Sequence, residues 1–446
     1  MKIEFINHAS FIIEHQGVKV MCDPWLFGSA FFNGWDLICK TQFEIDDFKN
    51  IDYIWFSHEH PDHFSPQVIN KIPREIRKEI TVLFHQTNDK KVINFCKEKG
   101  FKTQELSHLK KYTLASDFEI MCGKVFPFDS WICFYGDGKK ILNVNDCTVD
   151  GEAKAEALKL HTGEVDVLFT QFSYAAWKGN ESDIQLRKDS AASKLQIVTD
   201  QIHVFKNKAT IPFASFVYFS HEENSYMNNG VNLPIDAVNA IKKAGSEPIL
   251  MYPGDIWEVG TPWDNTVPNE KYEAEYAALV HKPYHKALKS FTEVELIKSC
   301  EDYLTKLKSK NNFFMIRMIK LLPSFHFFQP FNILIHDLNT VYQFDITKGL
   351  IRMPKGTKFD VKMHSESLDY VFKFDWGYDT LTVNGRFNAE IDGFNKMTKN
   401  FSIGSLNNMG RTISLKLLID YELIKNFLSA LYRFNKLMRK NSKLRA

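Results

Sequence analysis

Residues 57–63 read Ser-His-Glu-His-Pro-Asp-His and follow directly on an apolar Tyr-Ile-Trp-Phe run. That run predicts a short buried strand, so the polar residues emerge at its carboxyl end, where layered α/β folds place their chemistry. Imidazoles mixed with carboxylates are the ligands that borderline divalent ions bind. In an extended turn, His58 and His60 project to the same side. Because Asp62 and His63 then reach a neighbouring point, the spacing favours two metals that share a bridging oxygen.

Strand-like apolar runs alternate with amphipathic helical segments on both sides of this motif, up to residue 260. Such interleaving predicts a sandwich of β-sheets covered by helices. Residues 262–285 are rich in Pro and Tyr and read as a linker, and the segments after them predict helices and period-two strands, with a final helix from Ser414. We therefore expect a catalytic domain over residues 1–260 and a smaller α+β domain over residues 261–446.

The composition excludes several classes of protein. A hydrophobic share of 44% is enough for a large core, and a formal net charge of +2 gives no reason to expect a nucleic-acid partner. Seven cysteines without a CxxC pair argue against a disulfide framework and against a structural zinc knuckle. No segment reaches the roughly 20 apolar residues of a spanning helix. We expect a cytoplasmic protein that acts on a small-molecule substrate.

The motif is similar to the HxHxDH pattern of the metallo-β-lactamase superfamily, and residues 8–10 and 23–25 resemble its lactonase and phospholipase D branch. The catalytic region of the CMP-N-acetylneuraminate hydroxylases is more similar still, through residues 141–148, 171–173 and 212–221. The resemblance implies an αββα sandwich, followed in this chain by a smaller α+β domain.

The resemblance also implies a set of metal ligands. Asp146 would bridge two metals and His221 would be the last ligand of the second metal, beside the four ligands of the motif: His58, His60, Asp62 and His63. Taken alone, Asp146 could cap a helix and His221 could be a loop histidine. Asp62 or Asp146 would orient a metal-bound water or accept its proton. We expect His8 and Asp23 to orient the ligands rather than to bind metal.

One position departs from the family pattern. The hydroxylases have a histidine where this chain has Val125. Either the first metal site keeps three protein ligands, or Asp129 or His85 takes the place, or only one metal binds. Ligand chemistry permits zinc, iron or manganese. The expected cofactors are two divalent ions, with the completeness of one site left open.

Three functions fit these residues. The first is a metal-dependent hydrolase whose activated water attacks an ester, a lactone or a phosphodiester. The second, implied by the resemblance, is an iron oxygenase with one or two irons that hydroxylates an N-acyl sugar nucleotide or a similar substrate. The third is a degenerate scaffold that only binds a ligand, against which the intact motif argues.

Further sequence features bear on two partners, a redox protein and a membrane surface. No cysteine has the Cys-x-His or Cys-x-x-His neighbours of a Rieske cluster, so an oxygenase would take its electrons from a separate redox protein. The basic tail from Arg433 to Arg445 follows an apolar stripe. We expect that stripe to dock on the core and the basic end to be solvated, with contact to an anionic membrane surface as the alternative.

Overall fold

A computed structural model describes residues 1–126, 128–321 and 327–414. The chain forms two compact units. One comprises Met1–Ala287 together with Thr380–Asn388, and the other comprises Leu288–Asp379 and the described residues from Ala389 onward. The first unit therefore extends past residue 260 and takes in a short segment from far along the chain. The final helix predicted from Ser414 and the basic tail lie outside the described residues.

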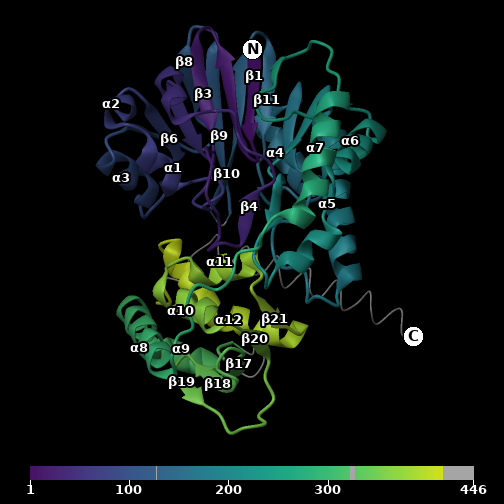
Figure 1. Ribbon diagram of the computed structural model, residues 1–446. Coiled ribbons are helices and arrows are strands. Elements are labelled where there is room, and N and C mark those ends of the chain that lie inside the picture. Colours follow the sequence, from purple (N-terminus) through teal and green to yellow (C-terminus); the bar gives the residue numbers. More distant parts are fainter. Residues whose placement is uncertain (127, 322–326, 415–446) are drawn as a thin grey trace, which may run out of the picture. The chain divides into compact units, whose positions relative to one another are not determined.

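Two seven-stranded sheets form the centre of the first unit (Figure 1). The first has the order β16-β1-β2-β3-β5-β6-β7, with β1 (Lys2–Asn7), β2 (Ser10–His15), β3 (Val18–Cys22), β5 (Tyr53–Phe56), β6 (Thr81–His85), β7 (Lys102–Leu106) and β16 (Ile256–Glu258). The second has the order β15-β13-β12-β11-β10-β9-β8, with β8 (Lys111–Ala115), β9 (Phe118–Val125), β10 (Asp129–Gly136), β11 (Lys139–Asn143), β12 (Val167–Gln171), β13 (Ala209–Phe213) and β15 (Glu247–Pro248). A separate ribbon pairs β4 (Trp35–Leu37) with β14 (Val217–Phe219).

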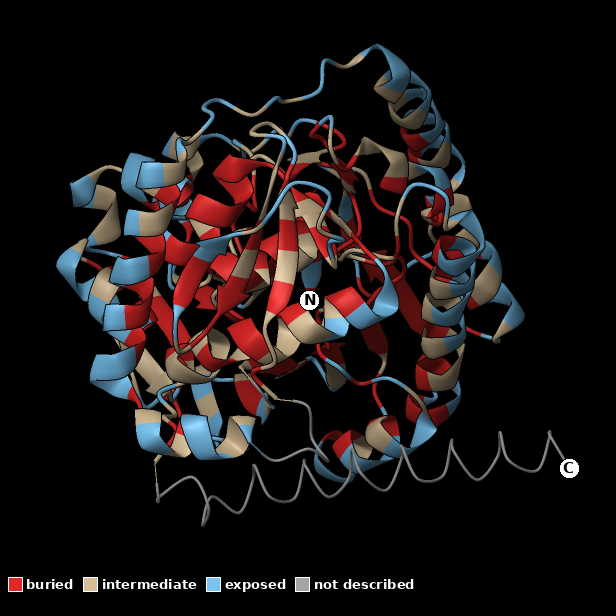
Figure 2. Ribbon diagram, turned by 90° about the horizontal axis from the view of Figure 1, so that it is seen from below, coloured by how far each residue is buried: buried red, intermediate tan, exposed pale blue. Residues whose placement is uncertain are grey.

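Helices cover the outer faces of these sheets. The α-helices of this unit are α1 (Pro66–Lys71), α2 (Arg74–Arg77), α3 (Lys91–Glu98), α4 (Glu152–Thr162), α5 (Ile184–Phe205), α6 (Pro234–Lys243) and α7 (Thr266–Ala278). Short 3-10 helices are η1 (Ile45–Asn50), η2 (Ser225–Gly230) and η3 (Leu279–His281). Figure 2 shows the strands largely buried and the outward helix faces exposed.

The strands are apolar on both faces, which is why both faces are covered. In β2, Phe11 and Ile13 belong to the core between the sheets, and the Phe11 ring stacks on Phe169 of β12 with centroids 4.1 Å apart. Ile12 points the other way, into a second core shared with Val68 of α1. Because side chains alternate along a strand, strands of the first sheet such as β2 contribute to both cores. The result is the expected αββα sandwich.

Residues 262–285 are not the linker that their composition suggested, because they contain helix α7. Tyr272 of this helix is buried, stacks on Phe216 and donates a hydrogen bond from its hydroxyl to the Met251 carbonyl at 2.9 Å. Pro268 lies in the first turn, where a missing backbone N–H leaves no hydrogen bond unmade. The linker prediction was wrong because this proline sits where a helix tolerates it.

The second unit has the α+β character expected of the C-terminal part. A five-stranded sheet of this part of the chain has the order β19-β18-β17-β20-β21, with β17 (Phe331–Ile335), β18 (Thr340–Asp345), β19 (Gly349–Arg352), β20 (Val361–Met363) and β21 (Phe387–Ala389). The remaining helices are α8 (Glu293–Lys310), α9 (Phe313–Lys320), α10 (Ser365–Lys373), α11 (Gly377–Asn384) and α12 (Ile391–Asn408). Within the described ranges, every helix is too short or too polar to cross a bilayer.

Candidate metal centre

Five of the six predicted ligands gather where strands of both sheets end: His58, His60, Asp62, His63 and Asp146. Strands β3 and β5 run parallel with Cys22 opposite Trp55, so their carboxyl ends share an edge of the first sheet. The 57–63 motif follows β5 at this edge, and Asp23 follows β3. In the second sheet, the loop after β11 carries Asp146. Parallel strands with a common carboxyl edge therefore bring residues from distant parts of the sequence together.

Three histidines and one carboxylate lie close together at this edge. His58 Nε2 and His60 Nδ1 are 2.8 Å apart. Asp146 lies beside them, with Oδ1 3.8 Å from His58 Nδ1 and Oδ2 3.7 Å from His63 Nε2. One ligand atom each from His58, His63 and Asp146 falls within 4.8 Å of the other two. This is the spacing of side chains that can share a metal ion.

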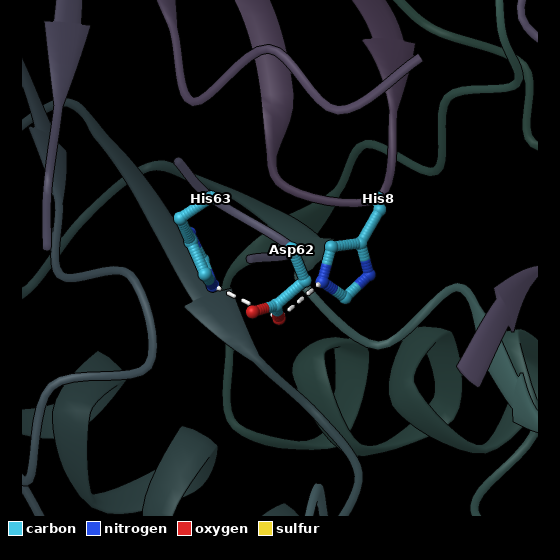
Figure 3. A group of neighbouring side chains, drawn as sticks. All are labelled: His8, Asp62 and His63. Atoms are coloured by element: carbon cyan, nitrogen blue, oxygen red, sulfur yellow. Dashed lines mark hydrogen bonds and ion pairs between the residues drawn. The ribbon is translucent and has the colours of Figure 1, made fainter. Parts of the chain in front are cut away.

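Asp62 and His63 form a second group with His8, which Figure 3 shows with the Asp62 carboxylate between the two rings. Asp62 Oδ2 lies 3.2 Å from His8 Nε2 and 3.3 Å from His63 Nε2. Burial alone would raise the pKa of Asp62, but His63 and His8 outweigh it and hold that pKa well below 3.8. Asp62 is therefore ionised in the folded protein.

Asp23 fixes the orientation of His63 through the ring nitrogen Nδ1. Its carboxylate accepts hydrogen bonds from the Ser57 backbone N–H and hydroxyl, both at 2.7 Å, and from His63 Nδ1 at 3.0 Å. Because Nδ1 is engaged, Nε2 of the ring points to Asp62 and Asp146. Hydrogen bonds of this kind fix the tautomer of a metal-binding histidine.

The structure distinguishes the candidates for the missing ligand. Val125 lies opposite Asp129 across the β9–β10 hairpin. Asp129 Oδ1 reaches to 3.6 Å from His58 Nδ1, and burial together with the Asp146 carboxylate raises the pKa of Asp129 to about 7. His85 is buried at the end of β6, where burial and Lys124 lower its pKa to about 3. Of the two candidates, Asp129 is the one that contacts a histidine of the motif.

The side chains at this centre fit a divalent cation. Asp62 Oδ1, His63 Nε2 and Asp146 Oδ1 are buried and make no hydrogen bond to any described residue. Buried polar atoms are normally satisfied, so three such atoms in one place indicate a missing partner. Burial lowers the pKa of His60 to about 4, so its imidazole is neutral and can donate a lone pair to a metal. A cation would also neutralise the clustered carboxylates.

His221 is buried in the loop after β14 and is held by an ion pair that the sequence does not reveal. Its Nδ1 lies 3.5 Å from Glu223 Oε2, and the same oxygen accepts a hydrogen bond from Arg386 Nε at 2.9 Å. Arg386 is 1% exposed and comes from the late segment that belongs to the first unit. Sequence reasoning missed this pair because 163 residues separate its members.

With this geometry established, comparison with known proteins places the unit. Residues 2–170 match the model of the Beta-lactamase superfamily domain. This part of the chain is similar to the domain of that superfamily.

Proteins that are similar to this chain in sequence include hydroxylases. A cytidine monophosphate-N-acetylneuraminic acid hydroxylase of Xenopus laevis is 25% identical over 286 residues, which cover 58% of this chain and 46% of the relative. The hydroxylase of Cricetulus griseus is 26% identical over 261 residues, 54% of this chain and 45% of the relative. The chain thus spans about half the length of the curated relatives it matches.

Solved structures of two chemistries resemble this chain with low sequence identity and low TM-scores. A diiron beta-hydroxylase from Streptomyces venezuelae has 13% identity and a TM-score of 0.41, covering 58% of this chain and 54% of that one. An isothiocyanate hydrolase from Delia radicum gut bacteria has 12% identity and a TM-score of 0.43, covering 58% and 99%. Likenesses of this size carry no argument about the reaction.

The loops of the metallo-β-lactamase domain hold several residues in the left-handed backbone region. His8, Asp23, Asn145 and Ala214 have φ of 43, 42, 57 and 51°, and each lies just after a strand. These conformations persist because the surroundings fix them. For example, the Ala214 N–H donates to the His8 carbonyl at 2.9 Å. Such strain is concentrated at functional sites.

Proposed function

We propose that this chain is an iron-dependent oxygenase that hydroxylates an N-acyl sugar nucleotide at a dinuclear centre. One observation supports the proposal: Asp129 lies 3.6 Å from His58 Nδ1 and opposite Val125, the position where the hydroxylases have a histidine. The centre then contains three carboxylates, from Asp62, Asp129 and Asp146. A ligand set rich in carboxylates suits iron and manganese. A ligand set rich in histidines favours zinc.

Each residue has a defined role in this proposal. His58, His60 and Asp129 would hold one iron, Asp146 would bridge, and a second set would hold the other iron: Asp62, His63 and His221. The bound irons would supply the activation of dioxygen. Because His63 and His8 keep Asp62 ionised, its Oδ1, which has no hydrogen-bond partner among the described residues, can accept a proton.

The sequence relatives support the substrate class, since their names describe hydroxylation of cytidine monophosphate-N-acetylneuraminic acid. In the balanced reaction, one substrate C–H bond, dioxygen, two electrons and two protons give an alcohol and water. A reduced iron-sulfur protein would supply the electrons, because the chain has no Rieske ligand pattern of its own.

Hydrolysis is the second candidate, and a specific feature favours it. The ionised Asp62 carboxylate is placed to accept the proton of a metal-activated water, which is the chemistry of an ester, lactone or phosphodiester hydrolase. The oxygen atom that enters the product comes from dioxygen in one reaction and from water in the other.

The source of this oxygen atom tests the proposal. Iron-loaded protein would be incubated with a reduced ferredoxin and cytidine monophosphate-N-acetylneuraminic acid under oxygen-18 gas, with His60→Ala as the matched inactive control. We expect a product that carries one oxygen-18 atom, detected by mass spectrometry. A product that takes its label only from oxygen-18 water would overturn oxygenation and establish hydrolysis.

A further inference from the structure

A cavity of about 310 Å³ opens beside helix α5 in the first unit. The residues that line it come from two places, the loop after β12 and one face of α5: Tyr174, Lys178, Asp189, Ser190, Ser193, Lys194 and Ile197. The Tyr174 ring forms a fixed wall, since it is buried and its hydroxyl donates a hydrogen bond to the Met227 carbonyl. The cavity is large enough for a phosphoryl group with part of its substituent.

Two lysines bring positive charge to this cavity. Neither forms an ion pair among the described residues, although the Asp146, Asp150 and Asp129 carboxylates act on Lys194 from a greater distance. Lys194 is half-buried and donates a hydrogen bond to the neutral Gln171 side chain. Lys178 is half-buried too, and no ion pair to it is found among the described residues. The one acid of the lining, Asp189, is exposed and accepts a hydrogen bond from Gln185 at 2.8 Å.

The pKa shifts of Lys178 and Lys194 are those expected of two ammonium groups that are partly buried near each other. Burial lowers the pKa of Lys178 and that of Lys194, and the charge of Lys178 lowers the pKa of Lys194 further. Partly desolvated cations close to each other are unfavourable unless an anion joins them. An anionic ligand would remove this repulsion.

The cavity lies near the metal centre. Gln171, which binds Lys194, is the last residue of β12, and β12 runs parallel between β11 and β13. The loop after β11 carries Asp146, so Lys194 and Asp146 come from neighbouring strand ends of one sheet edge. Consistent with this, the Asp146 carboxylate acts to raise the pKa of Lys194 against the effect of burial.

We propose that this cavity binds the phosphoryl group of the substrate, with Lys178 and Lys194 as its cationic contacts and the reactive part of the substrate directed to the metal centre. The inference rests on the proposed function for the identity of the substrate, but the anion site itself does not depend on the reaction. Two flexible ammonium groups suit a phosphoryl group, because each can approach one of its anionic oxygens as a point charge.

Binding of inorganic phosphate, followed by calorimetric titration of the full-length metal-loaded protein, tests the site. Lys178→Gln and Lys194→Gln should each weaken phosphate binding by about tenfold or more, because each removes a charge-assisted contact. Lys188→Gln is the matched control, since Lys188 lies exposed on the same helix and does not line the cavity. It should leave phosphate affinity unchanged. Thermal unfolding would show that each variant is folded.

A metal-site variant separates the proposed subsite from the centre, because phosphate can also bind metal. His60→Ala should keep the phosphate affinity of the wild type. Binding that His60→Ala abolishes and the two lysine variants leave intact would assign the anion to the metal and overturn the proposal. An absence of phosphate binding in the wild type would overturn it as well. If the lysine variants lose phosphate while the product label comes from water, the anion site stands and oxygenation fails.

Discussion

Replacing Arg386 by methionine should destabilise the first unit and loosen the second metal. The guanidinium is buried, donates to Glu223 Oε2 at 2.9 Å and lies 5.0 Å from the Phe32 ring centroid. Removing one partner of a buried ion pair costs about 3–5 kcal/mol. Because the Glu223 side chain keeps 16% exposure, we expect the lower end, about 3 kcal/mol. That corresponds to a fall in melting temperature of roughly 6–10 °C.

Calorimetry of metal-free and metal-loaded protein would measure this effect. Glu223→Gln in addition to Arg386→Met should recover most of the lost stability, since no charge is then left unpaired. Arg352→Met is the control, because Arg352 pairs with Glu293 at 2.9 Å on the surface and is expected to contribute less than about 1 kcal/mol. An Arg386→Met variant with the melting temperature of the wild type would contradict this expectation. So would an Arg386→Met, Glu223→Gln double variant that is no more stable than Arg386→Met.

Three further predictions address the metal ligands and a buried acid. His60→Ala should lose activity and most bound metal but keep the circular dichroism of the wild type, because ligands on loops contribute little to the core. Asp129→Asn should weaken metal binding in a titration. Val125→His should leave metal binding unchanged and lower the free energy of unfolding by about 1–3 kcal/mol, because the new imidazole is unpaired. Tighter metal binding by Val125→His would show that position 125 is a vacant ligand position. Burial raises the pKa of Asp379 to about 6 although Ser405 donates to it, so the folded chain keeps a proton that the unfolded chain loses near 3.8. The stability that this group contributes is therefore lost as pH rises from about 4 to about 6, and the loss is up to about 3 kcal/mol. Asp379→Asn should unfold at a higher temperature than the wild type at pH 8 but not near pH 4.

The sequence predicted the sandwich because the sandwich depends on local patterns, and the same patterns are the basis of the proposed metal centre. The apolar run before residue 57 and the run before Asp146 identify strands, and the carboxyl ends of such strands meet at one edge. Asp129 was one of several alternatives, since only the folded structure shows that its carboxylate lies 3.6 Å from His58 Nδ1.

Other features depend on tertiary contacts that no local pattern contains. Arg386 reaches Glu223 from a segment that is far away in sequence, in a part of the chain expected to form another domain. Lys194 lies on an ordinary amphipathic helix, and only the fold places it beside Lys178 in a cavity. The Pro- and Tyr-rich segment was misread because composition does not show that Tyr272 is buried.

The metal content of protein purified without added metal tests the central claim most directly. Elemental analysis combined with an optical spectrum would be compared for the wild type and Asp129→Asn. A carboxylate-rich dinuclear centre predicts iron at both positions with charge-transfer absorption, and loss of part of that iron in Asp129→Asn. Zinc as the only bound metal, with the same content in both proteins, would contradict the account.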